Sequence, residues 1–200
     1  STWGTANNWT SDSAGSTLLA GAPSTTADVG FAATGASNLS NTLGADYTVN
    51  TVTLSTGGVT IAGANTLTAN TTSALAIRDT ASSGTNVISA NLAGTGAGLT
   101  KSGAGTLTLS GANTFGGGLI LSAGTLNLNS DTAPGSGTIT ISGGTLDNTS
   151  GSGVTLSNNN TQSWNGDFTF TGTNTLNLGT GAVALGASRT VTVSGGTLGV

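Results

Sequence analysis

Short runs that alternate apolar and polar residues recur along most of the chain, separated by turns of small residues. Alternation with a period of two places the apolar residues on one face of a strand and Thr or Asn on the other. The pattern therefore predicts short β-strands that are buried on one side. Examples are Val52–Leu54, Val59–Ile61, Leu75–Ile77, Leu107–Leu109, Leu126–Leu128, Ile139–Ile141, Val154–Leu156, Phe168–Phe170, Leu176–Leu178, Val183–Leu185 and Val191–Val193.

A turn-plus-strand phrase, SxGTL, repeats at Ser122–Leu126, Ser142–Leu146 and Ser194–Leu198, and in a slightly longer form at Ser102–Leu107. The first three leucines of these phrases follow one another at nearly equal intervals, and the last comes after a much longer gap. A repeat near twenty residues, built from strand and turn formers, is typical of a β-solenoid. We predict an all-β parallel β-helix with three strands in each rung, roughly 20–24 residues per rung and roughly seven rungs.

The first 46 residues differ from the rest, because alternation is weak and Trp3, Trp9 and Pro23 interrupt a stretch of small residues. We predict an N-terminal cap over residues 1–46, which would cover the first rung, and β-helix repeats over 47–200. A loosely ordered leader is the alternative for 1–46. The phrase at 194–200 is elsewhere followed by another rung. We therefore expect continuation in a longer chain or end-to-end stacking on another subunit.

Composition supports strands over helices. Gly, Thr, Ser and Asn fill 117 of the 200 positions, and Glu and Met are absent, which leaves few good helix formers. Leu, Ile, Val and Phe number only 41, close to the level at which disorder becomes the default. The net charge of −4 is low for a disordered chain, although a disordered threonine-rich stalk remains the alternative.

The sequence offers no signal for a membrane span or for a signal peptide in this stretch. Cysteine is absent, so disulfides and thiolate metal sites are excluded. A polar surface with little charge and a pI near 4.1 favour an extracellular protein.

The chain lacks most of the residue types that enzymes use for catalysis. His, Cys and Glu are absent, so the common general bases and nucleophile partners are missing. The seven aspartates spread from Asp12 to Asp167 with no local pair, whereas glycosidases need two converging carboxylates. The only cations are Arg78, Lys101 and Arg189, too few to neutralise many phosphates or acidic sugars. We predict no catalytic, cofactor-binding or metal-binding residue, and no nucleic-acid partner.

Turn residues explain most of the remaining polar positions. Asp79, Asp131, Asp147 and Asp167 lie near turns, where Asp commonly bonds its own backbone. The stretch 94–102 has a weak likeness to a phosphate-binding loop, but Thr100 precedes Lys101 where the motif needs Gly. We interpret it as a solenoid corner.

Asparagines at strand ends predict side-chain amides that bond between successive rungs. They are Asn127, Asn148, Asn158, Asn159, Asn160 and Asn177. Trp164 is predicted to pack over a rung face or in a widened corner, with stacking on a glycan as the alternative.

Paired threonines raise the question of an ice-binding face. They are Thr51/Thr53, Thr66/Thr68, Thr106/Thr108, Thr138/Thr140, Thr169/Thr171 and Thr190/Thr192. Their intervals are irregular, so we expect the pairs to fall on different faces, and Thr is in any case favoured on the outer side of a strand.

Three stretches resemble a known family. Residues 99–115, followed by 122–126, resemble the autotransporter-associated β-strand repeat, also called the passenger-associated transport repeat. Residues 164–172, running on to 176–181, are similar to a segment of the large surface proteins that carry this repeat. The opening Thr2-Trp3 and Asn8-Trp9 are similar to the mature start of such proteins.

The resemblance implies a secreted, right-handed parallel β-helix that crosses a Gram-negative-type envelope and is displayed at the cell surface, associated with the outer membrane. It implies no catalytic residues. We therefore expect a noncatalytic structural protein that serves as a stalk, fibre or surface-layer component. The alternatives are an adhesin that binds glycans or host surfaces and, second, a carbohydrate-active β-helix enzyme.

Overall fold

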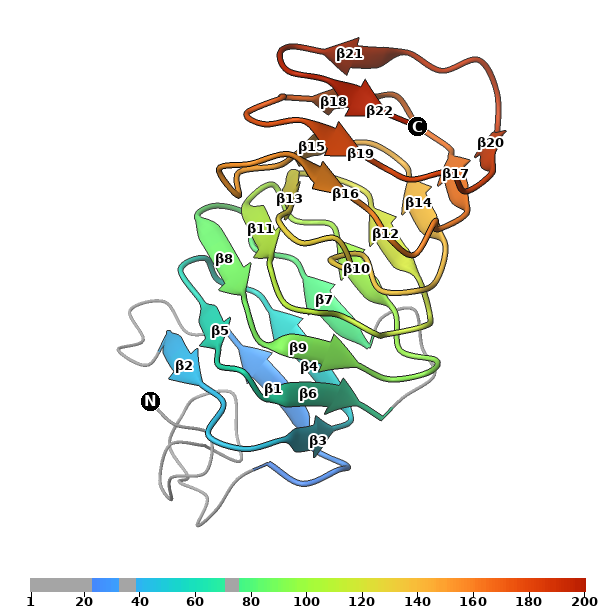
Figure 1. Cartoon of the computed structure of the whole chain (residues 1–200). Coiled ribbons are helices and arrows are strands. Elements are labelled where there is room, and N and C mark those ends of the chain that lie inside the picture. The colour runs from blue at the N-terminus through green and yellow to red at the C-terminus, as the bar shows by residue number, and fades with distance from the viewer. Residues whose placement is uncertain (1–22, 33–38, 71–75) are drawn as a thin grey trace.

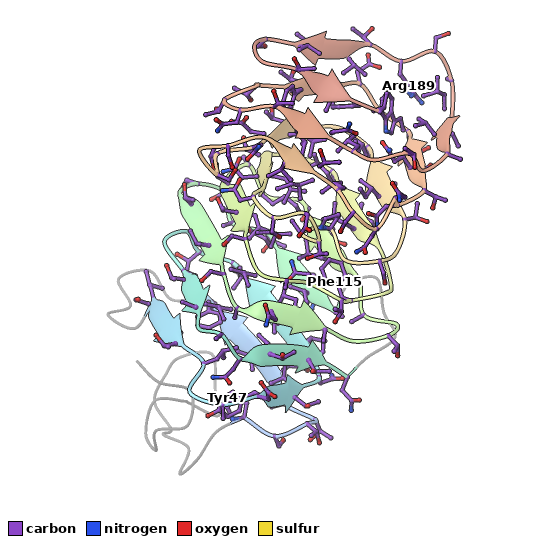
Figure 2. The ribbon with its side chains drawn as sticks, viewed as in Figure 1. Tyr47, Phe115 and Arg189 are labelled. Carbon is purple, nitrogen blue, oxygen red and sulfur yellow. The ribbon has the colours of Figure 1, made fainter. Side chains whose placement is uncertain are left out.

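The computed structural model describes residues 23–32, 39–70 and 76–200, and within these ranges it contains strands and no helix. The strands stack along one axis into a coil that rises from β1 to β22 (Figure 1). Side chains line the coil along its whole length, and Tyr47, Phe115 and Arg189 mark its lower, middle and upper parts (Figure 2). The all-β parallel β-solenoid predicted from the sequence is confirmed.

Two sheets of eight strands form two sides of the coil. The first sheet contains β1 (Asp28–Phe31), β4 (Thr51–Leu54), β7 (Ile77–Asp79), β10 (Leu99–Lys101), β12 (Leu119–Leu121), β14 (Ile139–Ile141), β17 (Gln162–Trp164) and β20 (Val183–Leu185). The second sheet contains β2 (Ser40–Thr42), β5 (Thr60–Ala62), β8 (Thr85–Ile88), β11 (Thr106–Leu109), β13 (Thr125–Leu128), β15 (Thr145–Asp147), β18 (Phe168–Phe170) and β21 (Val191–Val193).

The third side consists of two shorter sheets. The N-terminal one contains β3 (Tyr47–Val49), β6 (Thr66–Ala69) and β9 (Asn91–Ala93). The C-terminal one contains β16 (Val154–Thr155), β19 (Leu176–Asn177) and β22 (Leu198–Gly199). Each turn of the coil thus passes through the first sheet, the second sheet and the third side in order (Figure 1).

Neighbouring strands pair in parallel, one turn of the coil apart. The first-sheet ladder climbs in single turns through Val29, Val52, Ile77, Leu99, Leu119, Ile139, Gln162 and Val183. The turns differ in length, from the short one between Thr106 and Thr125 to the long one between Thr60 and Val87. The average length of one turn lies close to the middle of the predicted range and so agrees with the rung length expected from the sequence.

The core is a narrow stack of aliphatic side chains along the axis. Leu107, Leu126, Leu146 and Phe170 follow one another in a single ladder of the second sheet, and all four are completely buried. Each such side chain contributes about 1.5–3 kcal/mol when it leaves water. Because every level rests on the next, stability comes from stacking and not from any single turn.

The third side has no regular strand at residues 110–118 and 129–138. Hydrogen bonds of an asparagine side chain join the levels there. The side chain of Asn113 accepts a hydrogen bond from the amide of Leu92 (2.9 Å) and donates one to the carbonyl of Ala133 (2.8 Å). It therefore joins three successive levels, and Phe115 fills the space behind it with no exposed surface.

The coil begins before the predicted boundary at residue 47, since β1 and β2 already pair with β4 and β5. Trp3, Trp9 and Asp12 lie outside the described residues, as do most residues of the predicted cap. The division into a cap over 1–46 and repeats over 47–200 stays a prediction.

Candidate functional site

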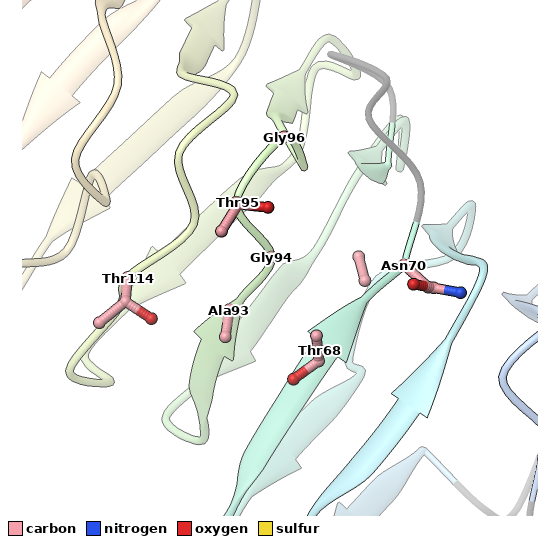
Figure 3. A pocket seen from close by; sticks show the side chains of 8 residues that line it. Thr68, Asn70, Ala93, Gly94, Thr95, Gly96 and Thr114 are labelled. Atoms are coloured by element: carbon pink, nitrogen blue, oxygen red, sulfur yellow. The ribbon is translucent and has the colours of Figure 1, made fainter.

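An open groove lies on the third side of the coil, with a volume of about 480 Å³. Its lining comes from three successive levels: the end of β6, the end of β9 with the turn that follows it, and Thr114 (Figure 3). The lining residues are Thr68, Ala69, Asn70, Ala93, Gly94, Thr95, Gly96 and Thr114. The volume falls within the range of small-molecule sites.

The groove has hydrogen-bonding capacity and no charge. Within the described part of the chain, the side chains of Thr68, Asn70, Thr95 and Thr114 make no hydrogen bond. Asparagine side chains elsewhere, such as that of Asn113, make hydrogen bonds between levels. With no titratable group and no aromatic ring in its described lining, the groove offers hydrogen bonds and no acid–base chemistry.

A second polar group lies inside the coil, where Asp79, Asn86 and Lys101 are at most 1% exposed. Asp79 at the end of β7 is the register partner of Lys101 at the end of β10. One carboxylate oxygen of Asp79 accepts from the amide of Ala81 (3.0 Å), and the other accepts from Nδ2 of Asn86 (3.2 Å). The Lys101 Nζ donates to the carbonyl of Gly103.

Burial shifts both titratable groups toward their neutral forms. Loss of hydration raises the pKa of Asp79, partly offset by its hydrogen bond from Ala81 and by the charge of Lys101. Loss of hydration also lowers the pKa of Lys101, partly offset by Asp79. Sequence reasoning placed Asp79 in a turn and Lys101 in a corner. It missed that the register brings them together.

Four further aspartates accept hydrogen bonds from the next level of the coil. Asp28 accepts from Asn50 and Thr51, which lowers its pKa. The carboxylates of Asp46, Asp147 and Asp167 accept from the amides of Thr66, Thr173 and Thr190, respectively. These last three bonds reach 20 to 26 residues along the chain. The predicted local turn bonds are present for Asp79, which accepts from the amide of Ala81, and for Asp147, which also accepts from the amide of Asn148. In the described ranges, His, Cys, Asp and Glu residues form no group of three that could hold a metal ion.

Trp164 points into the coil. Its side chain is 9% exposed, its ring meets that of Phe168 edge-on at 5.1 Å, and its Nε1 donates to Oε1 of Gln162 (3.2 Å). The packing role agrees with the first prediction for this residue. Stacking on a glycan stays a prediction, and it would require the ring to turn outward.

The asparagine prediction is confirmed for five of the six residues. Asn127, Asn148, Asn158, Asn159 and Asn160 bond to residues 19 to 27 positions away, one level along the coil. Asn177 instead accepts from the amide of Gly179 within its own turn.

Threonines form a continuous outer ladder on the second sheet. Its members are Thr85, Thr106, Thr125, Thr145, Thr169 and Thr192. The six pairs fall on different sides of the coil, as predicted, although one member of each of three pairs (Thr106, Thr169 and Thr192) belongs to this ladder. The residues two positions after these threonines, on the same strands, form a mixed ladder of Val87, Thr108, Asn127 and Asp147. The second sheet therefore does not present two parallel rows of threonine.

No helix in the described ranges is long and apolar enough to cross a membrane.

A family model matches residues in the middle of the coil. The family model for the passenger-associated transport repeat matches residues 99–128, which run from β10 to β13. The chain is 49% identical over 92 residues to a protein of Brucella suis biovar 1 (strain 1330) named adhesin BmaC autotransporter. The alignment covers 46% of this chain and 2% of that protein. No solved structure matches the chain.

The residues matched by the family model contain the first of the three stretches on which the sequence resemblance rested, and they form consecutive levels of the parallel coil. Residues 99–128 are therefore similar to the passenger-associated transport repeat, and they lie in a chain that folds as a β-solenoid.

Proposed function

We propose that the chain is a noncatalytic stalk segment of a bacterial surface protein. The observation that carries the proposal is the unbroken parallel pairing of eight strands in each of two sheets, from β1 to β20 and from β2 to β21. Pairing of this kind makes a rod in which each level supports the next. The proposed location is the cell surface, in association with the outer membrane.

The outer face supports a spacer role. It is dominated by Thr, Ser and Asn, and the whole chain has only ten charged side chains. Such a face stays hydrated while it offers few strong charges to a partner. A glycan-cleaving enzyme would need two converging carboxylates, whereas Asp46, Asp147 and Asp167 accept hydrogen bonds from the next level and the sequence has no local pair of aspartates.

An adhesin is the second candidate, because the relative in Brucella suis is named an adhesin and the groove beside β6 and β9 has unused polar side chains. In that case the groove would bind an uncharged glycan on a host surface. The stalk proposal expects no saturable binding by this chain.

A binding assay separates the two candidates. The purified chain would be titrated onto immobilised neutral glycans and onto host cells, beside an Asn70→Ala variant that changes the groove. Saturable binding that the variant loses would overturn the stalk proposal in favour of the adhesin. Absence of binding, together with rods in electron microscopy, would support the stalk.

We also propose longitudinal contact, either with further coils of the same protein or with a second subunit. Val183, Leu185, Val193 and Val200 are 38–63% exposed in the last level, although alternate residues of β20 and β21 continue the inward ladders of Gln162, Trp164 and Phe170. Sedimentation of the purified chain at rising concentration would show whether copies of it associate.

A further inference from the structure

One corner of the coil differs from the corners below it in the residue that follows the first-sheet strand. That position holds Ser102, Ser122 and Ser142 in three successive levels and Asn165 in the next. All four side chains are exposed. Asn165 is also the only asparagine of the sequence that is followed by glycine. This corner therefore holds an exposed side-chain amide directly before a glycine, which the serine corners lack.

Packing of the corner explains the glycine. A Cβ on Gly166 would lie 2.1 Å from the carbonyl oxygen of Ser142 in the level below, so a larger residue would not fit without a shift. The same lack of a Cβ leaves the backbone nitrogen of Gly166 open to the side chain that precedes it. A bond between this nitrogen and Cγ of Asn165 would close a succinimide ring.

Hydrogen bonds at the corner favour attack on the Asn165 amide. Ser163 Oγ donates to Oδ1 of Asn165 at 3.2 Å, and this donor would stabilise negative charge that develops on the oxygen. The N–H groups of Gly166 and Asn165 both donate to the carbonyl of Ile141, at 3.1 Å and 2.7 Å respectively. Gly166 makes the longer of these two bonds, so its nitrogen is the easier one to free.

A cation from the next level lies beside the same amide. Arg189 Nε donates to the carbonyl of Trp164 at 3.3 Å. A Cβ built on Gly186 would lie 3.1 Å from Oδ1 of Asn165 and 3.6 Å from Nη2 of Arg189, so the two side chains flank one point. The positive charge would favour negative charge on Oδ1 during attack, and also a carboxylate in place of the amide.

We propose that Asn165 is a site of spontaneous deamidation in the folded coil, promoted by Ser163. The Gly166 nitrogen gives its proton to hydroxide and attacks Cγ of Asn165. The bond between Cγ and Nδ2 breaks, and Nδ2 takes a proton from water and leaves as ammonia. Water then opens the succinimide at either of its carbonyls, which gives aspartate or isoaspartate. Water is the only co-reactant, and it reaches the corner because Asn165 is exposed.

Either product places a carboxylate beside Arg189, which belongs to the next level. Isoaspartate also adds a methylene group to the backbone between β17 and β18. The outer face gains a negative charge in a chain that has only ten charged side chains. The proposal concerns the chain's own chemistry, so it holds or fails independently of the stalk and adhesin alternatives.

Mass spectrometry of the folded chain after incubation at mildly alkaline pH tests the proposal. Trypsin cuts the denatured chain after Lys101 and Arg189, so residues 102–189 form one peptide that contains Asn165 and several other asparagines. Asn165 should be converted ahead of the others, and fragmentation that distinguishes isoaspartate should find both products. A digest of the chain without incubation supplies the background.

Two variants sharpen the test. Ser163→Ala removes the donor, and it is a mild change because the next residue in this ladder is Ala184. It should slow conversion in the folded chain about fivefold, the factor that corresponds to one net hydrogen bond. In urea the two proteins should react at the same rate, since Ser163 no longer faces the amide. Asn165→Ser, which copies the corners below, should abolish conversion at this position.

Three results would overturn the proposal. Conversion of another asparagine ahead of Asn165 would contradict the site. Equal rates for the folded wild-type and Ser163→Ala chains would contradict the promoting role of Ser163. Aspartate without isoaspartate would indicate direct hydrolysis by water and would contradict attack by the Gly166 nitrogen.

Discussion

The compact coils, residues 99–146, and the wide coil, residues 77–98, fill their interiors in different ways. In the compact coils the strands follow one another at short steps, such as Leu99 to Leu119, and the inward strand positions are leucines and isoleucines except for Lys101. The wide coil is reached by longer steps, from Val52 to Ile77 and from Thr60 to Val87, and it places Asp79 and Asn86 inside. Short corners thus accompany an aliphatic core, and longer ones accompany buried polar groups.

The two kinds of interior differ in how strongly they fix the register of the stacked levels. Leucines stacked on leucines stabilise any level equally well, so the compact coils would tolerate a shift by a whole level. A buried group with fixed hydrogen bonds accepts one register only, as a buried polar residue does in a coiled coil. Asp79, Asn86 and Lys101 would therefore set the register from which the compact coils continue.

The largest expected effect is loss of a core leucine in the compact coils. Leu126→Ala removes a completely buried side chain between Leu107 and Leu146, and we expect the free energy of unfolding to fall by about 2–5 kcal/mol. Urea unfolding measures the change. Thr125→Ala on the outer face is the control, and an equal loss there would contradict an inward Leu126.

A corner glycine should follow in size. A Cβ on Gly103 would lie 2.1 Å from the carbonyl oxygen of Ala81 in the level below, whereas one on Gly30 would meet nothing within 4 Å. Gly103→Ala should therefore destabilise the chain by about 1–3 kcal/mol, and Gly30→Ala should leave the urea midpoint nearly unchanged. If both variants unfold at the wild-type midpoint, the two levels are not in close contact at this corner.

Asn113→Ala tests the bridge that replaces a strand on the third side. The change leaves the buried amide of Leu92 and carbonyl of Ala133 without partners, so we expect a loss of about 1–3 kcal/mol. Asn70→Ala removes an exposed amide that has no side-chain hydrogen bond in the described part of the chain. Thermal unfolding that ranks Asn70→Ala as the more damaging change would refute the bridge.

The smallest effect is a dependence on pH. Because burial raises the folded-state pKa of Asp79 above 3.8, the folded chain binds this proton more tightly than the unfolded chain. Stability from this residue should therefore rise as the pH falls through the folded-state pKa toward 3.8. Asp28, whose pKa is lowered, acts in the opposite sense and loses its contribution as the pH drops below 3.8.

Urea unfolding at neutral pH and near the lower end of this range would separate these contributions. Asp79→Asn should remove the gain in stability at lower pH, and Asp28→Asn should retain it. Retention of the full gain in Asp79→Asn would show that another group is responsible.

The sequence predicts the compact coils well and the wide coil poorly. Leu107, Leu126 and Leu146 share a phrase and a spacing, and they do share a ladder. Leu198 carries the same phrase but pairs with Leu176 on the third side, while Phe170 and Val193 continue the ladder. The phrase describes any corner followed by any strand with Thr outside and Leu inside, so it cannot tell the sides apart.

The buried polar group could not be predicted from the sequence, because Asp79 and Lys101 lie far apart along the chain with no repeated phrase between them. Only the register of β7 and β10 brings them together. The groove depends likewise on how three levels meet beside β6 and β9, which no local pattern encodes.

The strands pair in parallel, one level above another, with one ladder formed by Thr85, Thr106, Thr125, Thr145, Thr169 and Thr192. Spin labels on cysteines introduced in pairs at Thr106/Thr125 and Thr145/Thr169 test it most directly, since the chain has no cysteine of its own. Adjacent strands are about 4.8 Å apart, so both pairs should show strong dipolar broadening. If either pair gives the sum of two isolated labels, the stacked coil is contradicted.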